Sequence, residues 1–147
     1  SNKIGDDGIQ ALASALVGGA FREMEWFSLS TNPIGDAGIV AFAEALEKGA
    51  LPKLKELFIH HTMMGPEGMK ALMEAARNGR LAKLEKLEIQ ANSFGTEGVG
   101  ALADAIAMKS LPSLKRMWID AEQWEMAQDA GRTRSFRKVT LYIHTTW

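Results

Sequence analysis

The chain of 147 residues contains no cysteine. This absence excludes disulfide bonds and thiolate metal ligands, and it favours a reducing compartment. No apolar run approaches the roughly 18 residues that a membrane-spanning helix needs, so we expect no membrane insertion. The sequence also lacks a signal-peptide pattern and an Asn-x-Ser/Thr glycosylation site. Together these absences predict an intracellular protein, located in the cytoplasm or in the interior of an organelle.

An excess of charge of one sign is missing as well. The chain has 17 lysines and arginines against 18 aspartates and glutamates, which leaves a formal net charge of −1. Such a chain has no strong overall field to attract nucleic acid, so we expect no nucleic-acid partner. Its 46% of hydrophobic and 24% of charged residues are typical of one soluble domain.

What the chain does contain is an internal repeat. A first pattern begins at Ile4 and returns every 30 residues, reading IGDDGIQALASAL, IGDAGIVAFAEAL, MGPEGMKALMEAA and FGTEGVGALADAI. A second pattern begins at Met24 and keeps the same spacing, reading MEWFSLSTN, LKELFIHHT, LEKLEIQAN and LKRMWIDAE. Four units in strict phase predict an architecture in which each unit contacts only its neighbours.

The first pattern of each unit predicts a helix. Its apolar residues follow helical spacing, as Ile39, Phe42 and Leu46 do in the second unit. Each helix is expected to begin with a first-turn acceptor or with proline, namely Asp6, Asp36, Pro66 and Thr96. Each is expected to end at a glycine in the left-handed conformation, namely Gly18, Gly49 and Gly79.

The second pattern predicts a short strand, because Leu57-Phe58-Ile59 and its counterparts form short β-type runs. Units of strand, turn, helix and loop stack into a parallel sheet with helices on its other side. Neighbouring strands lie about 4.8 Å apart whereas packed helices need about 8–10 Å. The stack must therefore curve, with the sheet on the inside.

The combined pattern, LxxLxLxxN followed by xIGDxGxxALAxAL, resembles the leucine-rich repeats of the ribonuclease-inhibitor type. The resemblance extends from residue 2 to about residue 122. It implies an α/β leucine-rich-repeat solenoid, a right-handed horseshoe with the parallel sheet on its concave face and the helices on its convex face. It also implies binding of another macromolecule, as in ribonuclease inhibitors, Ran GTPase activators and tropomodulins. No residue role carries over, because the matching positions are structural.

The chain is expected to divide into two parts. Residues 1–122 form four repeat units of 30 residues, of which the first begins in the middle of a repeat. Residues 123–147 lack the earlier helical pattern and are expected to form an irregular C-terminal cap. Alternation around Leu141 predicts a final strand in this cap. The step from Met117 to Leu141 is shorter than 30 residues, which indicates a shortened terminal unit that shields the last repeat.

The C-terminal part is locally basic, through Arg132, Arg134, Arg137 and Lys138. Two interpretations stay open for these residues. One is a solvated loop before the cap strand, and the other is a site for an anionic partner.

An asparagine recurs at the end of the strand pattern, at Asn2, Asn32 and Asn92. Its side chain is suited to bond backbone groups of neighbouring turns. Thr62 and Glu122 interrupt this ladder, and we expect a looser turn at Thr62. Because Asn2 is in phase without a preceding strand, we expect an upstream part of the native protein, or another segment, to cover this edge.

Strand alternation assigns the residues of the concave face. Leu57 and Ile59 point into the core, so Glu56 and Phe58 face outward. The same phase gives three columns across the sheet: Trp26, Glu56, Lys86 and Arg116; Ser28, Phe58, Glu88 and Trp118; Ser30, His60, Gln90 and Asp120. From these columns we predict a partner-binding surface made of Trp26, Phe58, His60, Lys86, Glu88, Arg116, Trp118 and Asp120.

Large aromatic side chains on a solvent-facing sheet favour a protein partner, because Trp and Arg are enriched at binding hot spots. The alternative is that the aromatic side chains pack against the chain's own tail or another domain. The acidic residues in the columns disfavour RNA. Ion pairs are expected between Glu56 and Lys86 and, diagonally, between Arg116 and Glu88.

No catalytic, metal or cofactor site is predicted. The GDAG turn resembles a phosphate-binding loop, but it recurs with variation in each unit and lacks a following Lys-Ser/Thr pair. His60 and His61 are adjacent on a strand, so their side chains diverge, and Asp120 is expected about 9–10 Å away across two strands.

The sequence therefore predicts a non-catalytic protein-interaction scaffold, within a longer chain or a multi-subunit assembly. Two alternatives stay open. One is a regulatory subunit such as a GTPase activator, acting through a rim loop. The other is a structural subunit fixed in a large assembly.

Overall fold

The computed structural model describes residues 3–145. Its elements follow one another in the order α1 (Asp6–Val17), β1 (Trp26–Ser28), α2 (Asp36–Glu47), β2 (Glu56–Phe58), α3 (Pro66–Arg77), β3 (Lys86–Glu88), α4 (Gly95–Ala107), β4 (Arg116–Asp120), α5 (Ala121–Asp129), the 3₁₀ helix η1 (Thr133–Phe136) and β5 (Thr140–His144). Strands β1 to β4 begin at the 30-residue spacing of the repeat.

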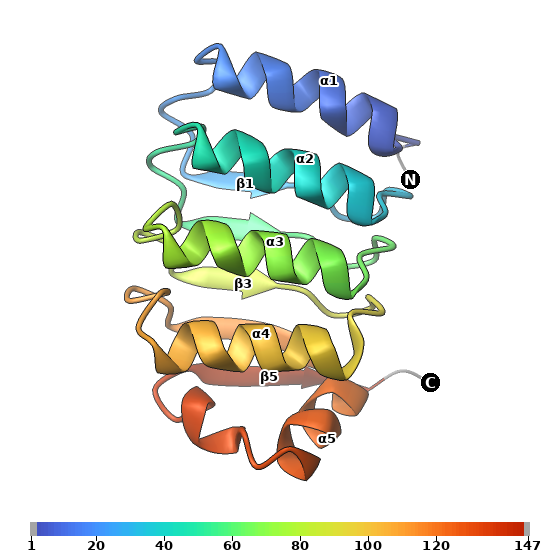
Figure 1. Ribbon diagram of the computed structural model, residues 1–147, viewed down its shortest axis with the longest axis vertical. Coiled ribbons are helices and arrows are strands. Elements are labelled where there is room, and N and C mark those ends of the chain that lie inside the picture. Colours follow the sequence, from blue (N-terminus) through green and yellow to red (C-terminus); the bar gives the residue numbers. More distant parts are fainter. Residues whose placement is uncertain (1–2, 146–147) are drawn as a thin grey trace.

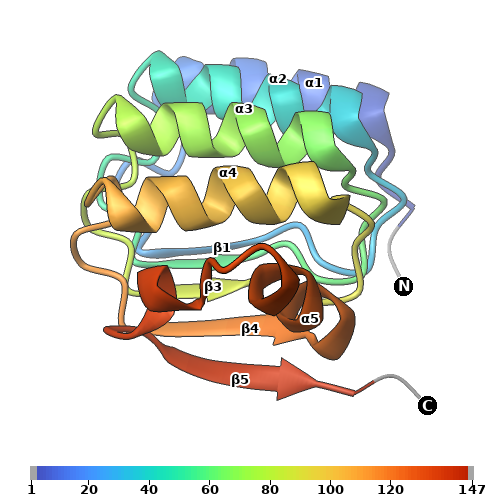
Figure 2. The same ribbon diagram turned by 60° about the horizontal axis from the view of Figure 1, so that its bottom comes forward.

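The strands form one parallel sheet in the order β1-β2-β3-β4-β5. Figure 1 shows helices α1 to α4 side by side over one face of this sheet, with the two ends of the chain at opposite ends of the stack. Figure 2 shows the two layers from another side, with the helices above the strands. The predicted fold class is confirmed: the protein is an α/β solenoid with its sheet on the concave face and its helices on the convex face.

The core lies between these two layers, and its positions depend on a preceding unit for their burial. Ile34, in front of α2, is 0% exposed, and Leu51, in the loop after α2, is 1% exposed. Their equivalents in the first unit are Ile4, which is 37% exposed, and Phe21, which is 54% exposed. The first unit thus exposes side chains that the second unit buries, because no unit precedes it among residues 3–145.

The aspartates at the helix starts bond the next unit rather than their own helix. Asp6 Oδ1 accepts hydrogen bonds from the backbone N–H groups of Gly35 (2.9 Å) and Gly38 (2.8 Å), at the start of α2. Asp36 accepts from the equivalent glycines of α3, at 2.8 and 2.7 Å. The expectation that these carboxylates serve their own helices is wrong. Each one caps the following helix, where unpaired N–H groups and the helix dipole favour negative charge.

Pro66 breaks this series, because it stands where the two earlier units have aspartate and carries no acceptor. Helix α4 therefore begins without a carboxylate from the preceding unit. It starts at Gly95, whose φ is 61°, whereas the equivalent Gly35 has a φ of −87°. Thr96, the expected acceptor for α4, makes no side-chain cap hydrogen bond.

The helix ends are marked by a left-handed residue in each unit. Gly49 (φ 89°) and Gly79 (φ 81°) adopt this conformation as expected. In the first unit the residue is Gly19 (φ 97°), whereas Gly18 has a φ of −69° and closes α1 in the right-handed conformation. The expectation for Gly18 was wrong by one residue, because the repeat phase selects the second of two adjacent glycines. The fourth unit has Lys109 at this position, with a φ of 60°.

The asparagine ladder links neighbouring units through backbone groups. Asn32 Nδ2 donates to the Leu29 carbonyl (3.1 Å), and its Oδ1 accepts from the N–H of Ile4 in the preceding unit (3.1 Å). Asn92 Oδ1 accepts from the N–H of Met64 in the same way (3.2 Å). Asn2 lies outside the described residues.

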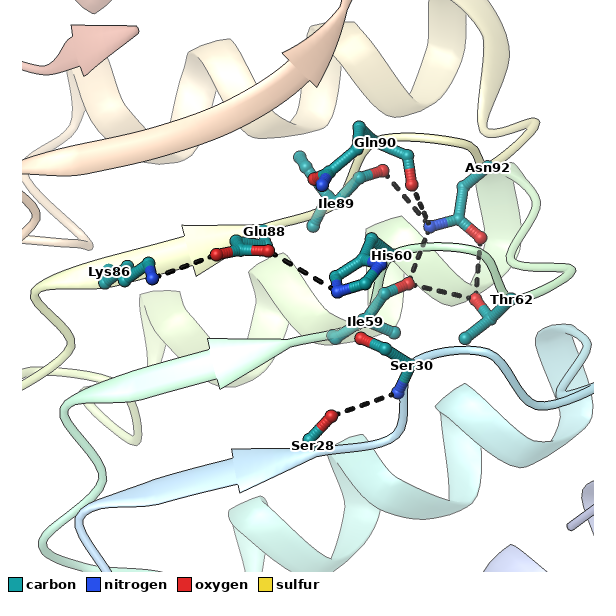
Figure 3. A network of polar contacts seen from close by, with 10 residues as sticks. All are labelled: Ser28, Ser30, Ile59, His60, Thr62, Lys86, Glu88, Ile89, Gln90 and Asn92. Carbon is teal, nitrogen blue, oxygen red and sulfur yellow. Dashed lines mark hydrogen bonds and ion pairs between the residues drawn. The ribbon is translucent and has the colours of Figure 1, made fainter. Parts of the chain in front are cut away.

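The interruption at Thr62 is compensated by its neighbours. Thr62 is too short to bond the N–H of Ile34, which donates instead to the Asn32 carbonyl (2.8 Å). Asn92 donates to the Ile59 carbonyl (2.7 Å) and lies 2.6 Å from the Thr62 hydroxyl. The turn at Thr62 thus keeps its polar groups bonded, as Figure 3 shows.

The C-terminal segment contains a helix that the sequence did not predict. Helix α5 follows β4 directly, and the Asp120 N–H donates to Gln123 Oε1 at its start (2.9 Å). Trp124 on α5 packs edge-on against Phe136 of η1, with ring centroids 6.1 Å apart. Because the buried residues of α5 are only Gln123 and Ala127, the helix has no apolar stripe to reveal it. Glu122, which interrupts the asparagine ladder, lies in this helix.

Strand β5 lies in the part of the chain where the alternation predicts a final strand. It pairs in parallel with β4, and Met117 stands opposite Leu141. Six fewer residues separate this pair than separate equivalent residues of the four units. The C-terminal unit is therefore shorter than the units that it follows.

Candidate functional site

Three columns of side chains cross the concave face in register. The first column is Trp26, Glu56, Lys86, Arg116 and Thr140, and the second column is Ser28, Phe58, Glu88, Trp118 and Tyr142. Backbone bonds from Thr31 to His60 and from His61 to Gln90 continue this pairing beyond β1, β2 and β3. The third column is therefore Ser30, His60, Gln90, Asp120 and His144.

Aromatic rings and one cation form a continuous stack on this face. Lys86 Nζ lies over the rings of Phe58 and Trp118, 4.7 and 4.6 Å from their centroids. Trp118 stacks on Tyr142, with centroids 4.1 Å apart and ring planes at 8°. A cation over an aromatic face contributes about 0.5–2 kcal/mol, depending on its exposure to water. The stack therefore holds these four side chains in place before any partner binds.

A chain of charged groups runs beside the stack, as Figure 3 shows. Lys86 Nζ lies 2.9 Å from Glu88 Oε1, and His60 Nε2 lies 3.4 Å from Glu88 Oε2. The expected pairs of Glu56 with Lys86 and of Arg116 with Glu88 are absent from the ion pairs of residues 3–145. Lys86 is held by the rings on either side of it, so it pairs with the carboxylate two residues along its own strand.

His60 is held in its neutral form by this environment. Burial lowers the pKa of His60 below its ordinary value of 6.5, and the Glu88 carboxylate opposes this shift. The nearby His61 and Lys86 lower the pKa further. A neutral imidazole has one donor nitrogen and one acceptor nitrogen, so His60 offers a neutral hydrogen-bonding group at pH 7 rather than a charge.

Every residue of the third column has a buried polar atom without a hydrogen-bond partner in the described part of the chain. These atoms are Ser30 Oγ, His60 Nδ1, Gln90 Oε1, Asp120 Oδ1 and His144 Nδ1. Gln90 is 8% exposed and Asp120 is 9% exposed. An unpaired buried polar group costs about 1–3 kcal/mol. The third column is therefore a row of hydrogen-bonding groups that the fold itself does not use.

The structure brings most of the predicted contact residues together, with three exceptions. Trp26 stands apart on the edge strand β1, where it is 59% exposed. Arg116 is exposed and has no ion pair within residues 3–145. Asp120 is partly structural, because its Oδ2 accepts a hydrogen bond from the Ala91 N–H (2.7 Å).

The prediction omitted Tyr142 and His144, which β5 adds to the second and third columns. The signal was the alternation of Tyr142 with Leu141 and Ile143, but the shortened C-terminal unit hid the register. Ser30 and Gln90 were assigned to the third column but not to the binding surface. Small or uncharged side chains carry no sequence signal for unpaired atoms.

Two other kinds of site were sought in the described residues. Across residues 3–145, no three histidine or acidic side chains lie together in a way that could hold a metal ion. The His60 and His61 rings are nearly perpendicular, at 81° with centroids 5.5 Å apart. In the same range, no helix has the length and apolarity that a bilayer crossing requires.

Three segments of the chain, residues 1–13, 27–43 and 80–103, match a family model described as a Leucine Rich repeat. No curated protein sequence matches the chain. The matched segments and the parallel sheet support a leucine-rich repeat protein, and the fold is that of a leucine-rich-repeat α/β solenoid. Leucine-rich repeats generally mediate protein–protein interaction and are typically non-catalytic modules.

Proposed function

We propose that this protein is a non-catalytic scaffold that binds a protein partner through the concave face of its sheet. The observation that carries the proposal is the third column, in which all five side chains keep an unpaired polar atom. A partner that supplies the matching donors and acceptors gains hydrogen bonds to groups that are already desolvated.

The aromatic side chains supply the apolar part of the proposed contact. A buried Trp or Phe removes roughly 150–250 Å² from water, which favours association by several kcal/mol before its costs are counted. Phe58 and Trp118 are already stacked against Lys86, so fixing them in a complex costs little further rotamer entropy. Trp26 is exposed and offers a second anchor on the edge strand.

The charges of the face point to a partner of mixed polarity. Lys86 and Glu88 neutralise each other, and Arg116 remains an exposed cation. We assign the contact to Trp26, Phe58, His60, Lys86, Glu88, Arg116, Trp118 and Asp120, with Tyr142 and His144 added from β5. Such a surface favours a polar segment with one or two apolar anchors over a highly charged ligand.

We also infer that the repeats are of the ribonuclease-inhibitor type and that the protein is intracellular. The full helices of 12 or 13 residues in each repeat unit support the first inference. The absence of cysteine supports the second. Fractionation of the native source, with immunodetection of the chain, tests the location.

Affinity capture from the native source tests the proposed function. The triple variant Trp26→Ala/Phe58→Ala/Trp118→Ala is expected to lose the partner that the wild type retains. The matched control is Phe21→Ala/Met63→Ala/Met108→Ala, which removes three exposed apolar side chains outside the columns and should retain the partner. Circular dichroism and melting curves establish that each variant folds. A folded concave-face variant that captures the same proteins as the wild type contradicts the proposal.

A further inference from the structure

A groove of about 610 Å³ opens where the fourth repeat unit meets the C-terminal segment. Its floor includes the buried side chains of Leu111, Leu114 and Val139, which are 5%, 7% and 8% exposed. The volume lies within the range of about 300–1,000 Å³ typical of ligand pockets. The groove is on the side of the molecule where the helices end, away from the three columns of the concave face.

The shortened C-terminal unit explains why this groove exists. In Figure 1, the segment after β4 lies at the end of the stack beyond α4. A full helix follows each of the other repeat units, but here the 3₁₀ helix η1 and the turn after it form the second wall. A single 3₁₀ turn covers less apolar surface than a helix of three turns. Part of the last unit's core therefore remains open.

Four cations line this apolar groove: Lys109, Arg134, Arg137 and Lys138. None of them has an ion pair among residues 3–145, whereas the neighbouring Arg132 is paired with Asp104. Side chains three residues apart eclipse on a 3₁₀ helix, which places Arg134 and Arg137 on the same side of η1. Four unpaired positive charges around an apolar floor favour a ligand that is both acidic and apolar.

Lys109 provides a second observation that points to a ligand. Its φ is 60°, in the left-handed region, and the equivalent residues of the other units are Gly19, Gly49 and Gly79. A side chain in this conformation costs about 1–2 kcal/mol relative to the right-handed one, and glycine avoids that cost. A lysine is therefore kept where glycine would be more stable, and its side chain lines the groove.

We propose that this groove binds an acidic peptide segment of a partner protein, with one apolar side chain of the peptide inserted between the four cations. The recessed floor accepts a side chain that projects from the partner, whereas a membrane surface calls for apolar side chains that project from the protein. No aromatic residue lines the groove, so it has no stacking surface for nucleic-acid bases. The site is independent of the concave face.

An array of immobilised heptapeptides tests this proposal on the intact chain. The flanking residues of the peptides are all glutamate, all lysine or all serine, and the central residue is phenylalanine, leucine or serine. We expect retention only by glutamate-flanked peptides with an apolar centre, and weaker binding as the salt concentration rises. The variant Arg134→Glu/Arg137→Glu is expected to lower the affinity about tenfold or more.

Two further variants separate binding from folding. Lys109→Gly is expected to weaken peptide binding several-fold without lowering the melting temperature, because glycine suits the positive φ. Lys48→Glu/Lys83→Glu makes the same charge change at exposed lysines outside the groove, and it should leave the affinity unchanged.

The following outcomes overturn the proposal. One is equal retention of peptides with apolar and serine centres, which indicates non-specific charge attraction. Another is an unchanged affinity in Arg134→Glu/Arg137→Glu. A third is binding to phosphatidylserine vesicles, but to no peptide of the array, that is lost in the same variant, because this result assigns the groove to a membrane surface instead.

Discussion

Two junctions of the solenoid can be compared position by position: the one between the second and third repeat units, and the one between the fourth unit and the C-terminal segment. At the first junction, the loop between Leu46 and Pro52 meets Gly79 and Arg80 of the next unit, and only about 140 Å³ remains open. At the second junction about 610 Å³ remains open. The residues of the two floors are similar, so the difference arises from what covers them.

The comparison shows that burial in this protein is a property of pairs of units. The equivalent leucines Leu81 and Leu111 are 1% and 5% exposed, in the same place of the same motif. A neighbour in strict phase covers the first, and a shortened cap covers the second. The terminal unit thus leaves an apolar opening that a partner can fill, whereas the regular units leave none of that size in the described residues.

The largest expected effect comes from truncating these two leucines. Leu81→Ala is expected to lower the free energy of unfolding by about 2–5 kcal/mol, because its cavity is enclosed. Leu111→Ala is expected to lower it by about 2 kcal/mol or less, because the groove already leaves that side chain partly uncovered. Urea denaturation followed by circular dichroism measures both losses. Equal losses contradict the difference in packing between the two junctions.

The next effect concerns the helix starts, where α3 receives a carboxylate from the preceding unit and α4 does not. Asp36→Ala removes the acceptor of two backbone N–H groups and is expected to destabilise the protein by about 1–2 kcal/mol. Its effect should be local, so that amide exchange in the first turn of α3 rises toward the rate in α4. The control Glu44→Ala removes an exposed acid from α2 and should change stability by about 0.5 kcal/mol or less. Unchanged exchange in α3 argues against the inter-unit cap.

A smaller effect is expected at the helix ends, where Gly79 and Lys109 occupy equivalent positions. Gly79→Ala should cost about 1 kcal/mol, because its φ is 81° and an added Cβ meets no other atom within 4 Å, so the loss is due to the backbone alone. Lys109→Gly should stabilise the protein by about 1 kcal/mol for the same reason. Thermal melting of both variants measures the changes. A stabilising Gly79→Ala contradicts this account.

The smallest effect is expected from acid, and it is expected in the regular part of the sheet. Burial lowers the pKa of His60 below 6.5, so below about this pH the unfolded chain binds more protons than the folded protein. Stability then rises with pH in this window, and it should fall between pH 7 and pH 5. The groups that face His60 are Glu88, His61 and Lys86.

His60→Asn should reduce this loss of stability, which melting temperatures at pH 5 and pH 7 measure. Glu88→Gln should increase it, because Glu88 opposes the lowering of the His60 pKa. An identical pH dependence in wild type and His60→Asn excludes His60 as the source.

Much of the candidate site follows from the repeat period alone. Because Trp26, Glu56, Lys86 and Arg116 are equally spaced in the sequence, a parallel sheet without insertions must place them side by side. The register at β5 was not accessible in this way, since Tyr142 reaches Trp118 only after a shorter unit. The pairing of Lys86 was also missed, because it depends on rings from both neighbouring strands.

The contacts between units are where sequence reasoning fails in a systematic way. Asp6 and Asp36 have the composition and position of ordinary helix caps, and nothing within their own unit indicates that they bond the next helix. The same is true of Asn92, which supplies the hydrogen bonds that Thr62 cannot make alone. Such bonds depend on the distance between neighbouring units, and a pattern within one unit does not contain that distance.

The sequence by itself determined the number of repeat units, the alternation of strand and helix, and the side of each strand that faces the partner. These follow from periodicity, because a period of two separates the faces of a strand and the period of the repeat aligns the strands. Only the tertiary structure decided which side chains pair, which polar atoms stay unpaired and where the stack remains open. Those properties depend on the fit between neighbouring units, and at the C-terminal end that fit changes because the last unit is shorter.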